Sequence, residues 1–157
     1  MIRSFYGISE NPFSNENVTL LPAQQDIYDT LKVHSSQGGF CLVMGMPGTG
    51  KTVIKEFLKN NESKQTLVVT IARTLHTYTN TIKILCQAFN VDFASCNFKC
   101  EKKLIEEALS LKQQGKTIVI IIDEAHLMEI STLRRLRLLF EDFPKNHNVI
   151  LIGQPEL

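Results

Sequence analysis

Apolar residues follow two different spacings along the chain. Continuous apolar or β-branched runs predict four strands, at residues 40–44, 66–71, 117–122 and 148–152. Before and between these runs, apolar residues recur every three or four positions, as they do on one face of a helix. That spacing predicts helices at residues 22–37, about 50–61, 78–89, 99–114 and 131–143. Strands that alternate with helices predict a three-layer α/β domain with a mainly parallel sheet.

The ends of two predicted helices carry residues that favour a start or a stop. Pro22 suits the first turn of the first helix, and Gly38 suits its end. Within that helix we expect Ile27 and Leu31 to face the core. We expect Ser131 to cap the last helix, because a hydroxyl can accept a hydrogen bond from an unpaired N–H group of the first turn.

The last predicted helix has a polar side with two alternative roles. Arg134 and Arg135 flank Leu138 on the side away from the core. Arg137 lies at the boundary, where it either pairs with Glu141 on the same helix or contacts a neighbouring subunit or nucleic acid. An exposed leucine between arginines slightly favours an interface.

Composition indicates one domain without a strong overall charge. The chain has 157 residues, of which 43% are hydrophobic, and it carries 17 Lys and Arg against 16 Asp and Glu. The chain therefore lacks the overall positive charge that would indicate nucleic-acid binding. Cys41 and Cys86 fall on predicted apolar faces, as reduced core thiols do. The sequence contains neither the apolar core of a signal peptide near Met1 nor an apolar run of about 18 residues, so we expect a soluble cytoplasmic protein.

A glycine-rich stretch gives the most specific chemical signal. Residues 45–52 read GMPGTGKT, which fits G-x-x-x-x-G-K-[ST], between a predicted strand and a predicted helix. In that context the backbone N–H groups of the loop and the positive end of the helix dipole bind a polyphosphate. Lys51 would reach the β- and γ-phosphates, and Thr52 would hold Mg²⁺. We expect the nucleotide to be contacted by Gly45, Pro47, Gly48, Thr49, Gly50, Lys51, Thr52 and Val53.

The third predicted strand ends in two acidic residues, Asp123 and Glu124. An uninterrupted apolar strand is typical of the centre of a parallel sheet, where helices cover both faces. Combined with the glycine-rich loop, this pattern predicts that Asp123 holds the Mg²⁺ water shell and that Glu124 polarises the attacking water. Gln154 follows the last strand, and it either senses the γ-phosphate or orients that water, or it is a turn residue.

Together these motifs resemble those of AAA+ ATPases, in particular the secretion ATPases typified by general secretion pathway protein A (ExeA), which are similar in turn to ATPase helpers of DNA transposition. The resemblance covers nearly the whole chain. Its motifs are FYGI at 5–8, PF at 12–13, GF at 39–40, the loop at 45–52, IDEAHL at 122–127, LRRLRLL at 133–139 and IGQPEL at 152–157. His126 and Leu127 stand where the family usually has Gln and Asn.

The resemblance implies a P-loop NTPase core over residues 23–157, with a sheet of strand order 5-1-4-3-2. An N-terminal arm at residues 1–22 would either pack its aromatic residues on the domain or line the adenine pocket. Domains of this family continue into a fifth strand, an arginine finger and a helical lid, so we expect a truncated core whose first strand is an open edge. Such an edge pairs with another copy or leaves the fold weakly stable.

The resemblance also implies the roles of the site residues. Lys51, Glu124 and Gln154 would be catalytic, with Gln154 near the first sensor position. Thr52 and Asp123 would be the Mg²⁺ ligands, and Asp123 with Glu124 would form the Walker B pair. We expect ATP hydrolysis that powers assembly of a secretion complex by a homo-oligomer. The alternatives are a nucleotide-dependent, DNA-binding helper of a transposase and a nucleotide-binding switch with negligible turnover.

Overall fold

A four-stranded parallel sheet forms the centre of the computed structural model, which describes residues 19–61, 63–71, 77–145 and 147–155. The strand order is β1-β4-β3-β2, with β1 at Gly39–Met44, β4 at His147–Gly153, β3 at Thr117–Ile122 and β2 at Thr66–Ile71. Every neighbouring pair is parallel. This order agrees with the 1-4-3-2 part of the order that the resemblance implies. The arm expected at residues 1–22 lies outside the described residues, apart from residues 19–22.

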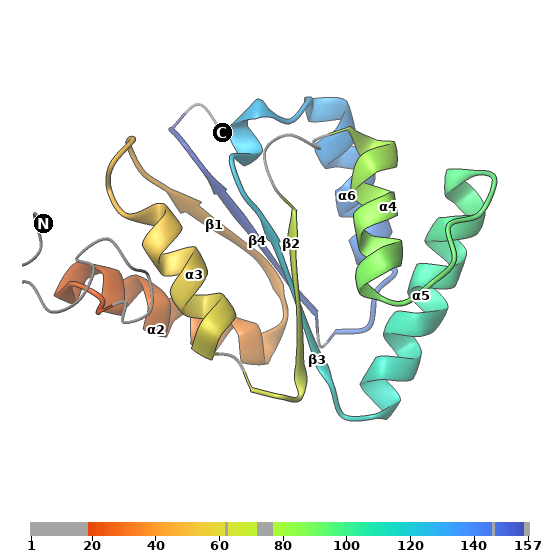
Figure 1. Ribbon diagram of the computed structural model, residues 1–157, viewed down its shortest axis with the longest axis horizontal. Coiled ribbons are helices and arrows are strands. Elements are labelled where there is room, and N and C mark those ends of the chain that lie inside the picture. Colours follow the sequence, from red (N-terminus) through yellow and green to blue (C-terminus); the bar gives the residue numbers. More distant parts are fainter. Residues whose placement is uncertain (1–18, 62, 72–76, 146, 156–157) are drawn as a thin grey trace, which may run out of the picture.

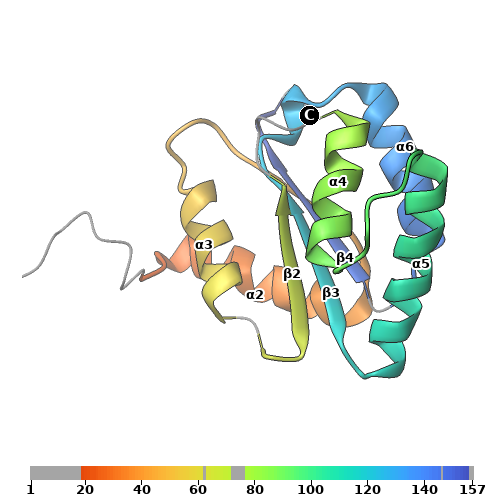
Figure 2. The same cartoon turned by 45° about the vertical axis from the view of Figure 1, so that its right-hand side comes forward.

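Helices cover both faces of the sheet (Figure 1). On one face lie α2 (Pro22–Gln37) and α3 (Lys51–Asn61), and on the other lie α4 (Tyr78–Ala88), α5 (Asn97–Gln113) and α6 (Ile130–Glu141). Figure 2, a turned view, keeps the two groups on opposite sides of the sheet. The three-layer α/β architecture predicted from the sequence is therefore confirmed. A short 3₁₀ turn, η3 (Ala125–Leu127), follows β3.

The central strand β3 contributes to both hydrophobic cores. Ile118, Ile120 and Ile122 belong to the core between the sheet and α4–α6. Val119 and Ile121 belong to the core between the sheet and α2 and α3. All five side chains are at most 1% exposed. Because helices cover both faces of this strand, its sequence is an uninterrupted apolar run instead of an alternating one.

The start of α6 differs from the sequence prediction. The helix begins at Ile130 with Glu129 as its N-cap residue, so Ser131 already lies inside the first turn. The Ser131 hydroxyl donates a hydrogen bond to Glu129 Oε2 at 3.2 Å, and it does not cap the helix. The prediction that Ser131 is the cap is therefore wrong.

The inward face of α2 is rotated from the predicted one. Tyr28 and Leu31 are buried, whereas Ile27 is 39% exposed. Tyr28 faces inward because its ring packs edge-on against Phe57 of α3, with ring centroids 4.8 Å apart. The large aromatic contact therefore sets which side of the helix is buried.

Cys86 lies in the core as the sequence predicts, whereas Cys41 is only half-buried. Cys86 is 1% exposed, and its burial, with the neighbouring Cys100 thiol, raises its pKa to about 11. Burial also raises the pKa of Cys41, which is only partly buried. Both side chains therefore remain protonated at neutral pH, and a protonated thiol is a weak nucleophile.

Candidate functional site

The expected site residues lie where the parallel strands end at their carboxyl side, near the upper edge of the sheet in Figure 1. The glycine-rich loop connects β1 to α3, Asp123 directly follows β3, and Gln154 directly follows β4. The Gly45 N–H donates to the Gly153 carbonyl at 3.2 Å, which ties the start of the loop to the end of β4. In open α/β sheets this edge is the usual position of a ligand site.

The loop has a tight backbone that requires glycine. Gly48 and Gly50 have φ angles of 81° and 85°, in the left-handed region that favours glycine. A Cβ added to Gly45 would lie 2.6 Å from Thr49 Oγ1. That hydroxyl instead donates to the Met46 carbonyl at 2.8 Å. The glycines of the motif therefore permit a compact loop that brings backbone groups close together.

Lys51 is turned back across the loop at the start of α3. Its ammonium donates to the Gly45 carbonyl at 2.7 Å and to the Met46 carbonyl at 3.0 Å. Thr52 is exposed in the first turn of the same helix. A lysine held by loop carbonyls lies within reach of any anion that the loop binds, and it can exchange those carbonyls for phosphate oxygens.

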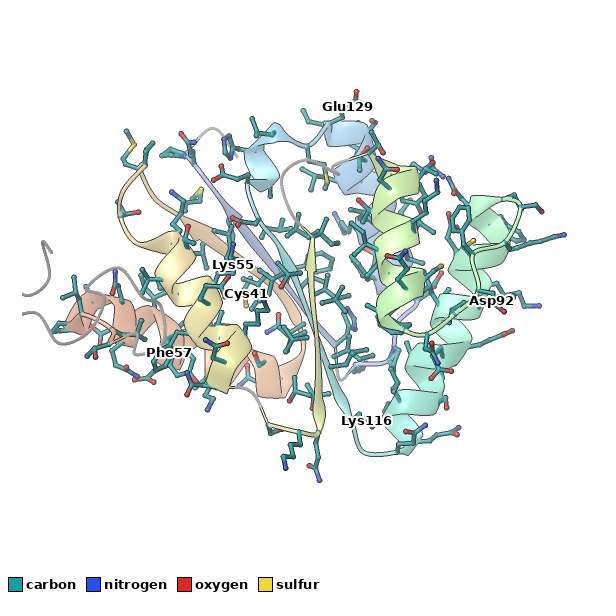
Figure 3. All side chains as sticks on the ribbon, in the orientation of Figure 1. Cys41, Lys55, Phe57, Asp92, Lys116 and Glu129 are labelled. Atoms are coloured by element: carbon teal, nitrogen blue, oxygen red, sulfur yellow. The ribbon has the colours of Figure 1, made fainter. Side chains whose placement is uncertain are left out.

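Asp123 is bound by Lys55, a residue that the sequence analysis did not identify. Lys55 Nζ lies 2.6 Å from Asp123 Oδ2, and the two side chains are 15% and 18% exposed. The other carboxylate oxygen, Oδ1, accepts the Glu124 N–H at 3.0 Å. Figure 3 labels Lys55, whose side chain extends from α3 toward the sheet. The signal in the sequence was its position four residues after Lys51, which places both lysines on one side of the helix.

His126 links the other two expected site residues. Its Nδ1 accepts the Gln154 N–H at 3.4 Å. The same nitrogen lies 3.5 Å from Glu124 Oε2, with which it forms an ion pair only when it carries a proton instead. Glu124 has a φ of 52°, a left-handed conformation that is uncommon outside glycine and that occurs preferentially at functional sites. The structure thus brings Glu124 and Gln154 to the same imidazole, although 30 residues of chain separate them.

Arg135 and Arg137 of α6 make contacts within the chain. Arg137 Nε donates to Glu141 Oε1 at 3.0 Å, which is the intrahelical alternative predicted from the sequence. The Arg135 guanidinium lies 3.7 Å from the centroid of the Tyr78 ring. The Arg137 and Arg135 side chains are nevertheless 72% and 54% exposed, so both charges remain at the surface of the helix.

The parallel sheet, the glycine-rich loop between β1 and α3 and the acidic residues after β3 define the class of P-loop NTPase folds. Residues 33–157 match the model of the AAA domain family. This match covers well over half of the chain, and the chain therefore belongs to the AAA domain family.

General secretion pathway protein A of Aeromonas hydrophila is similar to this chain, with 30% identity over 167 aligned positions. The alignment covers 100% of this chain and 30% of that relative, so the chain spans less than a third of the relative's length.

Several solved structures share the fold. They include the ORC2 protein of Aeropyrum pernix in ADPNP-ADP complexes, with a TM-score of 0.63 and 13% identity over 90% of this chain and 44% of that one. Cdc6p of Pyrobaculum aerophilum has a TM-score of 0.65 and 17% identity, over 92% of this chain and 42% of that one. Drosophila ORC bound to DNA has a TM-score of 0.65 and 20% identity, over 94% of this chain and 40% of that one. At these identities the likeness concerns the fold alone.

Proposed function

We propose that this chain is the nucleotide-binding core of an AAA+ ATPase that binds ATP with Mg²⁺ and hydrolyses it. One observation carries the proposal: the glycine-rich loop after β1 and the acidic pair Asp123 and Glu124 after β3 meet at one edge of the sheet. Membership of the AAA domain family supports it. The ORC2 protein of Aeropyrum pernix, whose fold is similar, forms complexes with ADPNP and ADP, which supports a nucleotide as the ligand.

Each residue of the site has a chemical role in this proposal. The loop N–H groups and Lys51 bind the β- and γ-phosphates, and Lys51 exchanges its loop carbonyls for phosphate oxygens. Glu124 orients and polarises the attacking water as a general base. Gln154, bonded through its N–H to His126 at 3.4 Å, has its side chain available to sense the γ-phosphate.

Thr52 and Asp123 are the residues that would hold Mg²⁺. The chain fits such an ion because the Asp123 carboxylate already accepts a cationic group, the Lys55 ammonium, at 2.6 Å. A hydroxyl and a carboxylate are also the oxygen donors that Mg²⁺ prefers. When bound, the ion neutralises charge that develops on the phosphate oxygens.

We infer that the client process is secretion and that the chain works as a homo-oligomer. The support is the 30% identity to General secretion pathway protein A, whose name refers to a secretion pathway. The alternative of a DNA-binding transposition helper is not supported by the overall charge, because the chain carries 17 Lys and Arg against 16 Asp and Glu. The other alternative, a switch with negligible turnover, is separated from an ATPase by the next experiment.

Phosphate release and ATP binding together test the proposal. We expect Glu124→Gln to lower phosphate release by about 100-fold or more, as is typical for loss of a general base, with ATP binding retained. We expect Lys51→Ala to abolish binding of a fluorescent ATP analogue. Tight binding by Lys51→Ala would refute the loop assignment. A release rate unaffected by Glu124→Gln would leave the switch as the better description.

A further inference from the structure

Lys55 contacts one of the two residues that would hold Mg²⁺ in the proposed function. Its ammonium forms a charge-assisted hydrogen bond of 2.6 Å to Asp123 Oδ2. Both side chains are less than one-fifth exposed, at 15% and 18%. Water therefore screens this pair much less than it screens the surface pairs of the chain, such as Lys102 with Glu106, whose side chains are 74% and 63% exposed.

Both carboxylate oxygens of Asp123 already have a hydrogen-bond donor. Oδ1 accepts the Glu124 N–H at 3.0 Å, and Oδ2 accepts the Lys55 ammonium. The N–H donor is part of the backbone next to Asp123 and moves with it. The ammonium is carried by a flexible four-carbon stem, so it is the donor that can leave. A metal ion that needs Asp123 must therefore compete with Lys55.

Lys55 also has an alternative acceptor close by. Glu56 Oε1 lies 3.9 Å from Lys55 Nζ, at the outer limit of an ion pair. Glu56 is 32% exposed, so an ammonium that moves toward it gains contact with water as well. Release from Asp123 thus leaves Lys55 with a partner, which makes two discrete positions of the side chain possible.

We propose that Lys55 is a competing cation at the metal site: it holds Asp123 in the nucleotide-free chain and is displaced when Mg²⁺ and nucleotide bind. The inference rests on the proposed function, because it needs Asp123 to hold the metal. Two cations cannot share one carboxylate oxygen without strong repulsion, so Lys55 lowers the affinity of the site for a divalent ion. The phosphate charges of a nucleotide offset that repulsion, and the metal therefore enters with the nucleotide and not alone.

The test measures binding of Mn²⁺ to the full chain by electron paramagnetic resonance, with and without saturating ADP. Lys55→Met keeps the length of the side chain and removes its charge. We expect it to tighten Mn²⁺ binding by about tenfold, with the larger gain when ADP is absent. Lys55→Arg keeps the charge and is expected to bind Mn²⁺ as the wild type does. If the methionine variant does not melt cooperatively, Lys55→Gln provides the same readout.

Lys59→Met is the matched control. Lys59 lies on the same helix, contacts the same Glu56 at 3.9 Å and is 54% exposed, and its removal changes the net charge equally. We expect Lys59→Met to leave Mn²⁺ affinity unchanged. Equal effects of Lys55→Met and Lys59→Met, or weaker binding by Lys55→Met, would overturn the inference and assign the pair a purely structural role.

The same measurements distinguish a failure of this inference from a failure of the proposed function. ADP binding that is lost in Lys51→Ala, together with Mn²⁺ affinity unchanged in Lys55→Met, would refute the inference and leave the proposed function standing. A wild-type chain that binds no nucleotide, or Mn²⁺ binding insensitive to Asp123→Asn, would overturn both.

Discussion

At the level of single residues, two glycines with similar φ angles make it possible to distinguish the effect of backbone strain from an effect on nucleotide binding. Gly48 lies in the glycine-rich loop with a φ of 81°, and Gly115 lies after α5 with a φ of 74°. A Cβ added at either position meets no atom within 4 Å. Alanine would therefore introduce the left-handed strain alone, about 1–2 kcal/mol in each case.

We predict that Gly48→Ala and Gly115→Ala lower the free energy of unfolding by similar amounts, measured in urea. Only Gly48→Ala is expected to weaken binding of a fluorescent ATP analogue, because only that loop presents its N–H groups to phosphate. Weakened binding in Gly115→Ala of the same size would show that general destabilisation accounts for the effect.

The sequence points to a candidate site residue when neighbouring residues define its role. Lys51 and Thr52 belong to one contiguous motif, and Asp123 follows a recognisable buried strand. Lys55 and His126 were missed because their partners are distant in the sequence, by 68 residues for Lys55 and Asp123 and by 28 for His126 and Gln154. Such pairs form only when the strand order brings the ends of β3 and β4 beside the loop.

At the level of elements, one polar cluster holds three helices together. The Tyr78 hydroxyl of α4 donates to Glu101 Oε1 of α5 at 2.7 Å. Arg135 of α6 lies over the Tyr78 ring, with its Nη2 3.8 Å from the same Glu101 oxygen. Tyr78 is 7% exposed. The cluster therefore fixes the position of α6, which follows the acidic residues of the site, relative to α4 and α5.

We predict that Tyr78→Phe lowers the free energy of unfolding by about 1–2 kcal/mol, since it removes a buried hydrogen bond to a charged group. Lys102→Ala on α5 is the control. It removes an exposed ion pair with Glu106, and we expect a change of less than about 0.5 kcal/mol. Urea unfolding of both variants provides the measurement, and equal losses would contradict the assigned role of the cluster.

The same cluster predicts a dependence of stability on alkaline pH. Burial, and then Glu101, raise the pKa of Tyr78 above its ordinary value. Because the folded-state pKa is raised, the contribution to stability is complete below a pH of about 10, the unfolded value, and is lost as the pH rises toward the folded value.

We therefore expect the free energy of unfolding to fall more steeply above a pH of about 10 in the wild type than in Tyr78→Phe. Parallel curves for the two proteins would show that Tyr78 does not titrate differently in the folded and unfolded states.

Helix and strand positions were predictable wherever an apolar period was clear. The expected bounds of residues 22–37 and 66–71 coincide with α2 and β2. The inward face of α2 was not predictable, because Tyr28 is turned inward by Phe57, a contact between two helices. The start of α6 was displaced because both Glu129 and Ser131 are suitable for the first turn, and local sequence does not decide between them.

At the level of the whole molecule, β1 is an edge of the sheet among the described residues. Its alternate side chains Phe40, Leu42 and Met44 are 47%, 49% and 56% exposed. Hollows of about 500 Å³ and 470 Å³ adjoin the strand, one lined also by α2 and the other by residues of η3 and α6. An apolar edge strand of this kind favours pairing with another chain.

We predict that the chain self-associates with increasing concentration in sedimentation velocity experiments and that Leu42→Lys shifts it toward monomer. A charge on the strand edge is a known means of blocking such pairing. Leu109→Lys is the control, because Leu109 is also exposed, at 45%, but lies on α5. A wild-type chain that is monomeric at high concentration and also melts at high temperature would contradict the prediction.

The parallel pairing of β1 with β4 also sets an order for folding during synthesis. Gly39 pairs in register with Asn148, so the first strand finds its neighbour only after more than a hundred further residues have been made. Parallel pairing over such separations is slow, because much chain entropy is lost before contacts form. The Gly45 N–H, which bonds to the Gly153 carbonyl, completes its contact later still. A nascent chain on the ribosome would therefore carry the whole glycine-rich motif, yet would bind nucleotide only once β4 had emerged from the exit tunnel.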